Sequence, residues 1–122
     1  MDNSKTTSIM TVFDSEEVAA NGSALSDAID VGQNGGSFSV QVALTGDGTM
    51  KLEWLGSLDG QNFLVPNGAS EIVTGFTKTS GPGSDGKHIY SFSPSLVKAL
   101  KLKISETGGL DSITGTVTLA VQ

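Results

Sequence analysis

"MKLEWLGSLDGQNFLV", residues 50–65, indicates the fold class because it joins a strand pattern to a tight turn. Met50, Leu52 and Trp54 alternate with Lys51, Glu53 and Leu55, as in a strand that buries one face. The Asp59-Gly60 step supplies the backbone geometry that a hairpin turn needs. The sequence therefore predicts a hairpin that returns Phe63 to the core. The apolar face of its first strand holds Met50, Leu52 and Trp54, the only tryptophan of the chain.

The same alternation recurs along the chain, and glycine-rich steps such as Asn21-Gly22 and Asp85-Gly86 separate the segments. The pattern predicts one all-β domain over residues 8–122, preceded by a flexible polar arm at 1–7. We expect an antiparallel two-sheet β-sandwich, jelly-roll or immunoglobulin-like, with about eight strands and very little helix. Only "SPSLVKA" (93–99) could form a helical turn. The clearest predicted strands are 37–45, 50–58, 98–105 and 112–121, and the weaker ones are 8–13, 24–31, 70–74 and 87–92.

The charge balance argues against a nucleic-acid partner. The chain has 13 acidic residues and 7 basic ones, all lysine, with a net charge of -6. It therefore lacks arginine for bidentate contacts to phosphate, and its charge repels nucleic acid. Residues 1–30 hold six acids and one lysine, whereas residues 87–103 hold four lysines and no acid. These two segments could pair within a monomer or between subunits, or could form two solvated faces.

Other function classes find little support in the sequence. Cysteine is absent, which excludes disulfides and thiolate metal sites and fits folding in a reducing compartment. The longest apolar runs are far shorter than the ~20 residues that span a bilayer, and the first ten residues lack the apolar segment of a signal peptide. We therefore expect no membrane association. The chain is also expected to have no small-molecule substrate and no cofactor.

Catalytic and metal-binding residues are not predicted. The lone His88 shares a strand face with Tyr90 and Phe92, which favours a packed strand residue over a general base. Calcium is the one metal with candidate ligands, since oxygen-rich loops can bind it. Those loops match no known calcium-loop spacing, and their acids are expected to hold the local backbone turns instead. The candidate ligands are Asp47, Asp59 and Asp85.

Two segments outside the strand pattern are the candidate partner-binding surface. The polar arm could become ordered along a partner. The second segment, "GFTKTSGPGSDGK" (75–87), is a long glycine-rich loop in which Phe76 is expected to be exposed. The predicted partner-binding residues are Asn3, Ser4, Lys5, Thr6, Thr7, Phe76, Thr77 and Lys78.

The order of these features over residues 20–122 resembles the small β-sandwich virion proteins of tailed bacteriophages. Such proteins share a Ser-x-Asp-Gly-x-x-Phe hairpin after an aromatic-bearing strand. They also share an F-x-P segment, a strand that alternates lysine with apolar residues, and a threonine-rich last strand. The matching positions are Ser57, Asp59, Gly60 and Phe63, Phe92 and Pro94, Leu100 to Ile104, and Thr114 to Val121.

The resemblance implies a non-enzymatic structural protein of a phage particle, assembled in the host cytoplasm. Its expected role is a capsid decoration or cement protein that binds the major capsid protein on the head surface, with copies of itself as further partners. The alternative is a tail, neck or adhesin-type module that binds glycans through Phe76, Tyr90 and nearby aspartates. The sequence leaves head and tail locations open.

Overall fold

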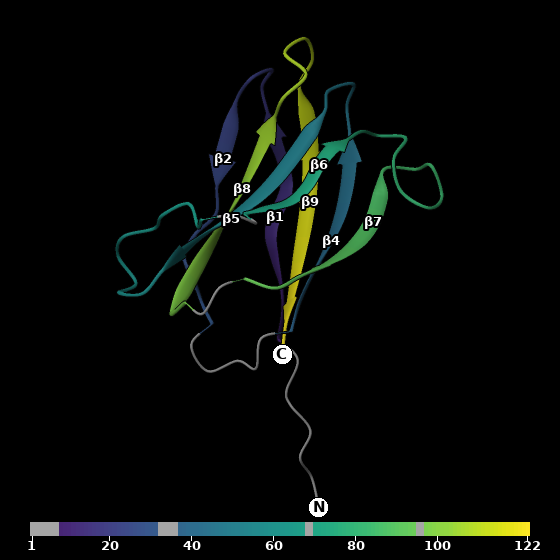
Figure 1. The fold of residues 1–122 in the computed structure, drawn as a ribbon. Helices are drawn as coiled ribbons and strands as arrows, with labels where there is room; N and C mark the ends of the chain where they lie inside the picture. Colours follow the sequence, from purple (N-terminus) through teal and green to yellow (C-terminus); the bar gives the residue numbers. More distant parts are fainter. Residues whose placement is uncertain (1–7, 32–36, 68–69, 95–96) are drawn as a thin grey trace, which may run out of the picture.

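The computed structural model describes residues 8–31, 37–67, 70–94 and 97–122, and all regular structure in these ranges is β. Nine strands form two antiparallel sheets that face each other (Figure 1). The sandwich architecture predicted from the alternation is therefore confirmed. The strands are β1 (Ser8–Val18), β2 (Ser23–Leu25), β3 (Ile29–Asp30), β4 (Phe38–Thr45), β5 (Met50–Ser57), β6 (Glu71–Phe76), β7 (Lys87–Phe92), β8 (Ala99–Glu106) and β9 (Ile113–Val121).

The strand order identifies the sandwich as a jelly roll. The first sheet has the order β1-β9-β4-β7, and the second has β2-β8-β5-β6, with β3 also paired to β8. The first half of the chain thus pairs with the second half in reverse: β1 with β9, β2 and β3 with β8, β4 with β7, and β5 with β6. This nesting is a long hairpin wrapped into two sheets, and it decides between the two sandwich types that the sequence left open.

Three boundaries differ from the predicted ones. β1 continues to Val18, because register shifts after Thr11 and Phe13 let it stay paired with β9 while its alternation breaks down. The predicted strand at 24–31 is divided into β2 and β3. Residues 95–96 of the possible helical turn lie outside the described residues, and its described part is not helical.

The core lies between the two sheets and consists of their inward-facing side chains. Trp54 is 3 % exposed, as the alternation of β5 predicts. Val40 and Leu119 of the first sheet, and Leu102 and Ile104 of the second, are fully buried. The expectation that Phe63 packs onto this core is wrong. Its ring is only partly buried and lies under the Lys101 ammonium, 4.7 Å from Nζ to the ring centroid.

The acidic and basic segments noted in the sequence each contribute strands to both sheets, because β2 and β3 pair with β8 in the second sheet and β7 belongs to the first. Glu16 and Glu17 are on β1 of the first sheet, whereas Lys101 and Lys103 are on β8 of the second. The outer face of the second sheet carries its own ion pairs, from Lys51 to Glu53 at 3.6 Å and to Glu71 at 2.9 Å.

A buried carboxylate, that of Glu106, fixes the loops at one end of the sandwich. The side chain is 2 % exposed, and its two oxygens accept hydrogen bonds from four backbone N–H groups. These bonds lower the pKa of Glu106 to about 2. The donors are Asn21 at 3.0 Å, Thr49 at 2.9 Å, Gly108 at 2.7 Å and Gly109 at 2.8 Å.

Replacing Glu106 by glutamine should lower the melting temperature at neutral pH by at least about 5 °C. The amide would turn its NH2 group toward two backbone donors and leave them without an acceptor. Because folding lowers the pKa of Glu106 from 4.5 to about 2, its stabilisation is complete above pH 4.5. That stabilisation is lost as the pH falls toward 2. Calorimetry from pH 7 to pH 2 measures both effects.

The matched control is Glu17→Gln, because the Glu17 side chain is exposed on β1. This control should melt like the wild type across the pH range. Glu106→Gln should be less sensitive to acid than the wild type between pH 4.5 and pH 2. Equal acid sensitivity in wild type and Glu106→Gln would contradict the role assigned to this carboxylate.

The lack of a side chain at Gly56 lets the segment before β8 pack against β5. A Cβ atom at this position would lie 2.7 Å from Val97 Cγ1 and 2.9 Å from Trp54 Cζ3. Both distances are shorter than real Cβ contacts, and neither a β-branched side chain nor an indole ring can move easily. Close packing at this point therefore requires glycine.

Gly56→Ala should lower the free energy of unfolding by about 1–3 kcal/mol, the usual effect of overpacking. Urea denaturation followed by Trp54 fluorescence measures this change. Gly83→Ala is the control, because its Cβ would contact only the flexible Asp85 side chain, at 3.3 Å or more. An unchanged unfolding midpoint in Gly56→Ala would show that Val97 and Trp54 are not packed as described.

Candidate interaction surface

A turn centred on Asp59 follows β5 and folds the next residues back over the sheet. One Asp59 oxygen accepts hydrogen bonds from Ser57 Oγ and from the backbone N–H groups of Gln61 and Asn62, all at 2.8 Å. The other oxygen accepts from Asn62 Nδ2 at 2.7 Å. These donors hold the pKa of Asp59 well below its usual range. The carboxylate therefore acts on its own backbone, as the Asp-Gly step predicts.

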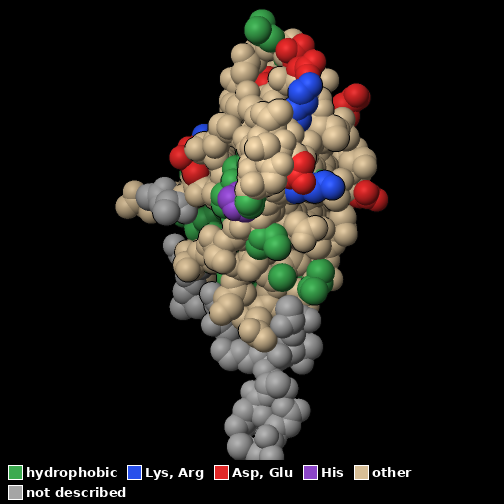
Figure 2. Space-filling view, turned by 90° about the vertical axis from the view of Figure 1, so that its right-hand side faces the viewer, with side chains coloured by type: hydrophobic (Ala, Val, Ile, Leu, Met, Phe, Trp, Pro, Cys, Tyr) green, Lys and Arg blue, Asp and Glu red, His purple; other side chains and the backbone are tan. Residues whose placement is uncertain are grey.

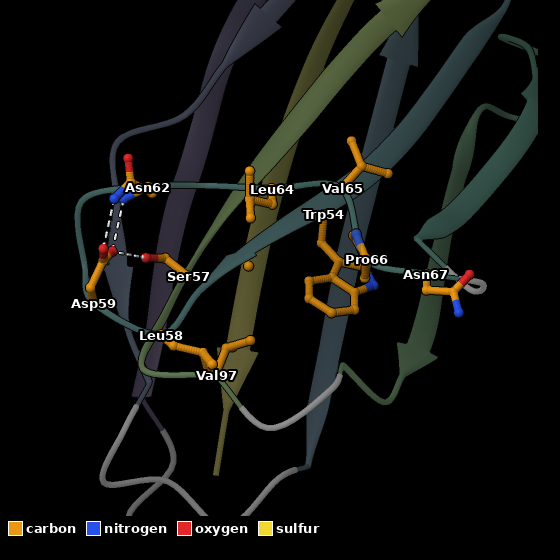
Figure 3. Close-up of a pocket in the computed structure, with 11 residues that line it drawn as sticks. Trp54, Ser57, Leu58, Asp59, Asn62, Leu64, Val65, Pro66, Asn67 and Val97 are labelled. Atoms are coloured by element: carbon orange, nitrogen blue, oxygen red, sulfur yellow. Dashed lines mark hydrogen bonds between the residues drawn. The ribbon is translucent and has the colours of Figure 1, made fainter.

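After this turn the chain returns beside β5 and closes one side of a groove. The N–H of Leu64 donates to the Gly56 carbonyl at 2.9 Å, and the N–H of Gly56 donates to the Leu64 carbonyl at 3.0 Å. The groove has a volume of about 800 Å³, and the nearly buried Trp54 indole forms part of its floor (Figure 3). Sequence alternation could not reveal this groove, because it depends on a pairing outside the regular strands.

Several large apolar side chains lie exposed next to one another in the walls of the groove. Leu58, Leu64 and Val65 are 77 %, 69 % and 67 % exposed, and Val97 and Pro66 lie beside them. Contiguous apolar surface with a polar rim is typical of an interaction site. The sequence offered one signal for it, the run of three apolar residues at 64–66 directly after a turn.

Lysine side chains lie at the edge of the groove. Among the described residues, Asp59 is the acid that lines it, and its carboxylate is hydrogen-bonded within its own turn. Lys98 extends along Gly60, where an added Cβ would lie 3.8 Å from its Nζ. Lys101 lies over the Phe63 ring, next to Leu64. A partner with acidic groups around an apolar contact would suit this edge.

The predicted partner-binding residues of the 75–87 loop do not form one exposed cluster. Phe76 was expected to be exposed, and this expectation is wrong: its side chain is 2 % exposed. Gly75, with φ of 66°, lies just before it in β6, and the Phe76 ring packs edge-on against Tyr90 at 6.2 Å. The Thr77 N–H donates to Ser80 Oγ at 2.9 Å.

Lys78 is the accessible member of that set. Its side chain is 54 % exposed and pairs with Asp47 of the β4–β5 loop, which raises the pKa of Lys78. The remaining predicted residues, Asn3 to Thr7, lie outside the described residues. A partner-binding role for either group stays a prediction.

His88 packs against an aromatic ring in its strand, and the three aspartates considered as calcium ligands lie in loops. The His88 ring centroid lies 4.2 Å from that of Tyr90, with the two rings tilted by 53°, consistent with the packed strand residue predicted. Burial raises the pKa of Tyr90. Asp47, Asp59 and Asp85 lie in separate loops, and no three acidic or histidine side chains come together in the part of the chain that the structure describes. The described residues contain no helix that is long and apolar enough to cross a membrane.

Solved structures similar to this chain include a prophage-derived protein and a viral particle protein. No protein family and no curated sequence matches the chain. The SPBc2 prophage-derived protein YomS has a TM-score of 0.56 and 11 % identity, over 96 % of this chain and 94 % of YomS. The VP2 subviral particle of infectious bursal disease virus has a TM-score of 0.61 and 11 % identity, over 95 % of this chain. This chain spans 31 % of VP2, about one third of its length. The likeness shows a shared jelly-roll fold.

Proposed function

We propose that this chain is a non-enzymatic structural protein of a bacteriophage particle, and that it decorates the capsid by binding the major capsid protein. The jelly-roll fold, matched along almost its whole length by a prophage-derived protein and also by part of a viral particle protein, carries this proposal. The exposed groove adds a surface through which such a protein could bind a partner.

The glycan-binding alternative has less support. Carbohydrate sites stack sugars on exposed aromatic rings, and the proposed platform, Phe76, is buried. Tyr90 is partly buried and packs between Phe76 and His88. A tail location of the same structural protein remains an outcome of the experiment below.

Virions purified from a strain that carries this gene should contain the protein in a fixed ratio to the major capsid protein. Quantitative mass spectrometry of gradient-purified particles measures that ratio, and immunogold labelling distinguishes heads from tails. Label on tails would contradict capsid decoration while keeping a virion role. Absence of the protein from particles would contradict both.

Deleting residues 1–7 should weaken binding to particles that lack the protein by at least about tenfold, because the arm is proposed to order along the capsid. The fold should persist, since β1 begins at Ser8. Cosedimentation with such particles measures the binding. Lys78→Ala, which removes an exposed lysine from the 75–87 loop, tests the second predicted segment. Full binding by the shortened chain would contradict the role of the arm.

A further inference from the structure

The loop between β8 and β9 presents one leucine almost entirely to solvent. Leu110 is 88 % exposed, the highest value among the exposed large apolar side chains of the described residues. Gly108 and Gly109 precede it, so no neighbouring side chain on that side shields it. Glu106 accepts hydrogen bonds from both glycine N–H groups and fixes the base of the loop. The result is a narrow apolar tip that is already ordered before it meets a partner, which reduces the entropy cost of binding.

Acidic side chains surround this tip. Asp111 follows Leu110 directly, and Asp47 of the adjacent β4–β5 loop pairs with Lys78. The Asp47 carboxylate and, to a smaller extent, the charge of Asp111 raise the pKa of Lys78. Figure 2 shows acidic groups, with lysine between them, gathered at this end of the molecule and a hydrophobic side chain at its extremity.

The apolar tip and the apolar groove lie at opposite ends of one strand pair. β5 and β8 pair from Met50 with Glu106, next to the tip, to Ser57 with Ala99, next to the groove. Eight paired residues separate the two ends by about 25 Å at the rise of a β-strand. The tip of one chain cannot reach its own groove, so any contact between them joins two molecules.

The two features are complementary in polarity and in charge. The tip offers one leucine beside a carboxylate, and the groove offers Leu64, Val65 and Val97 beside lysine. Asp59, the only acid that lines the groove, is engaged by its own turn. A second copy of this acidic chain could therefore approach the groove with its tip without bringing unpaired like charges together.

We propose that the groove binds the tip of a second copy of this chain. Leu110 of one copy enters between Val65 and Val97 of the next, above Trp54, and Asp111 faces Lys98. The contact joins unlike surfaces, so repetition produces a ring or an open chain. It does not depend on the proposed virion role, because it rests on surfaces of the isolated chain.

Two substitutions test the contact from its two sides. Leu110→Asp should prevent the tip from binding, and Val65→Asp should prevent the groove from accepting a tip. Both residues are exposed, so the fold should be retained. Sedimentation velocity over roughly 10 µM to 1 mM should show wild-type mass rising with concentration, and each variant should weaken this self-association at least tenfold. Leu25→Asp is the control, an exposed leucine outside both surfaces. A wild type that stays monomeric would overturn the proposal.

Mixing the variants distinguishes this contact from a symmetric one. The Val65→Asp chain keeps a working tip and the Leu110→Asp chain keeps a working groove. An equimolar mixture should therefore form a dimer of one copy of each and nothing larger. If the contact were instead symmetric, from groove to groove, the Leu110→Asp chain would form dimers with itself and the Val65→Asp chain would stay monomeric. That result would overturn the proposal.

Cysteine crosslinking gives an independent measurement, since the chain has no cysteine of its own. A Leu110→Cys chain mixed with a tagged Val65→Cys chain should form the mixed disulfide under mild oxidation. Leu25→Cys with the same tagged chain is the control and should react much more slowly. Equal rates for the two pairs would overturn the proposal. Raising the salt concentration should slow formation of the mixed disulfide, because it screens the Asp111–Lys98 attraction.

Discussion

The pairing of β5 with β8 is the constraint on which the rest of the structure depends. Its register places Trp54 opposite Leu102 and Leu52 opposite Ile104, so four core side chains face the first sheet together. A slip of one residue would turn all of them to solvent. The same register places the acidic tip at one end of the pair and the groove at the other. Core and surface are thus specified by one set of backbone hydrogen bonds.

Two carboxylates, one at each end of this strand pair, organise the loops. Glu106 accepts hydrogen bonds from four backbone N–H groups. Asp59 accepts them from two backbone N–H groups and two side-chain donors. In both cases the charged form is the one that bonds, which is why each pKa is lowered. Acids that could suggest catalysis or metal binding in the sequence therefore shape the surfaces on either side of them.

The alternation of apolar and polar residues predicted the strands well, because the side chains on the buried face of a strand recur every two residues. It failed where the backbone departs from that period. Gly75 interrupts β6 and turns Phe76 inward, while the Asp59 turn sends Phe63 outward beneath Lys101, so the predicted positions of these two rings are reversed. The groove escaped prediction because the bridge between Gly56 and Leu64 is a tertiary contact without a periodic signal.

The proposed arm contact and the groove lie at the same end of the molecule, and the tip lies at the other end. Ser8, where the arm begins, pairs with Val121 beside the C-terminus (Figure 1), and Ser37 of the adjacent segment bonds to Gln122. The groove lies at this end too, whereas Leu110 lies at the other. A chain held to a capsid by its arm would therefore present its tip away from the attachment point, where the groove of a further copy, not attached at that level, could bind it.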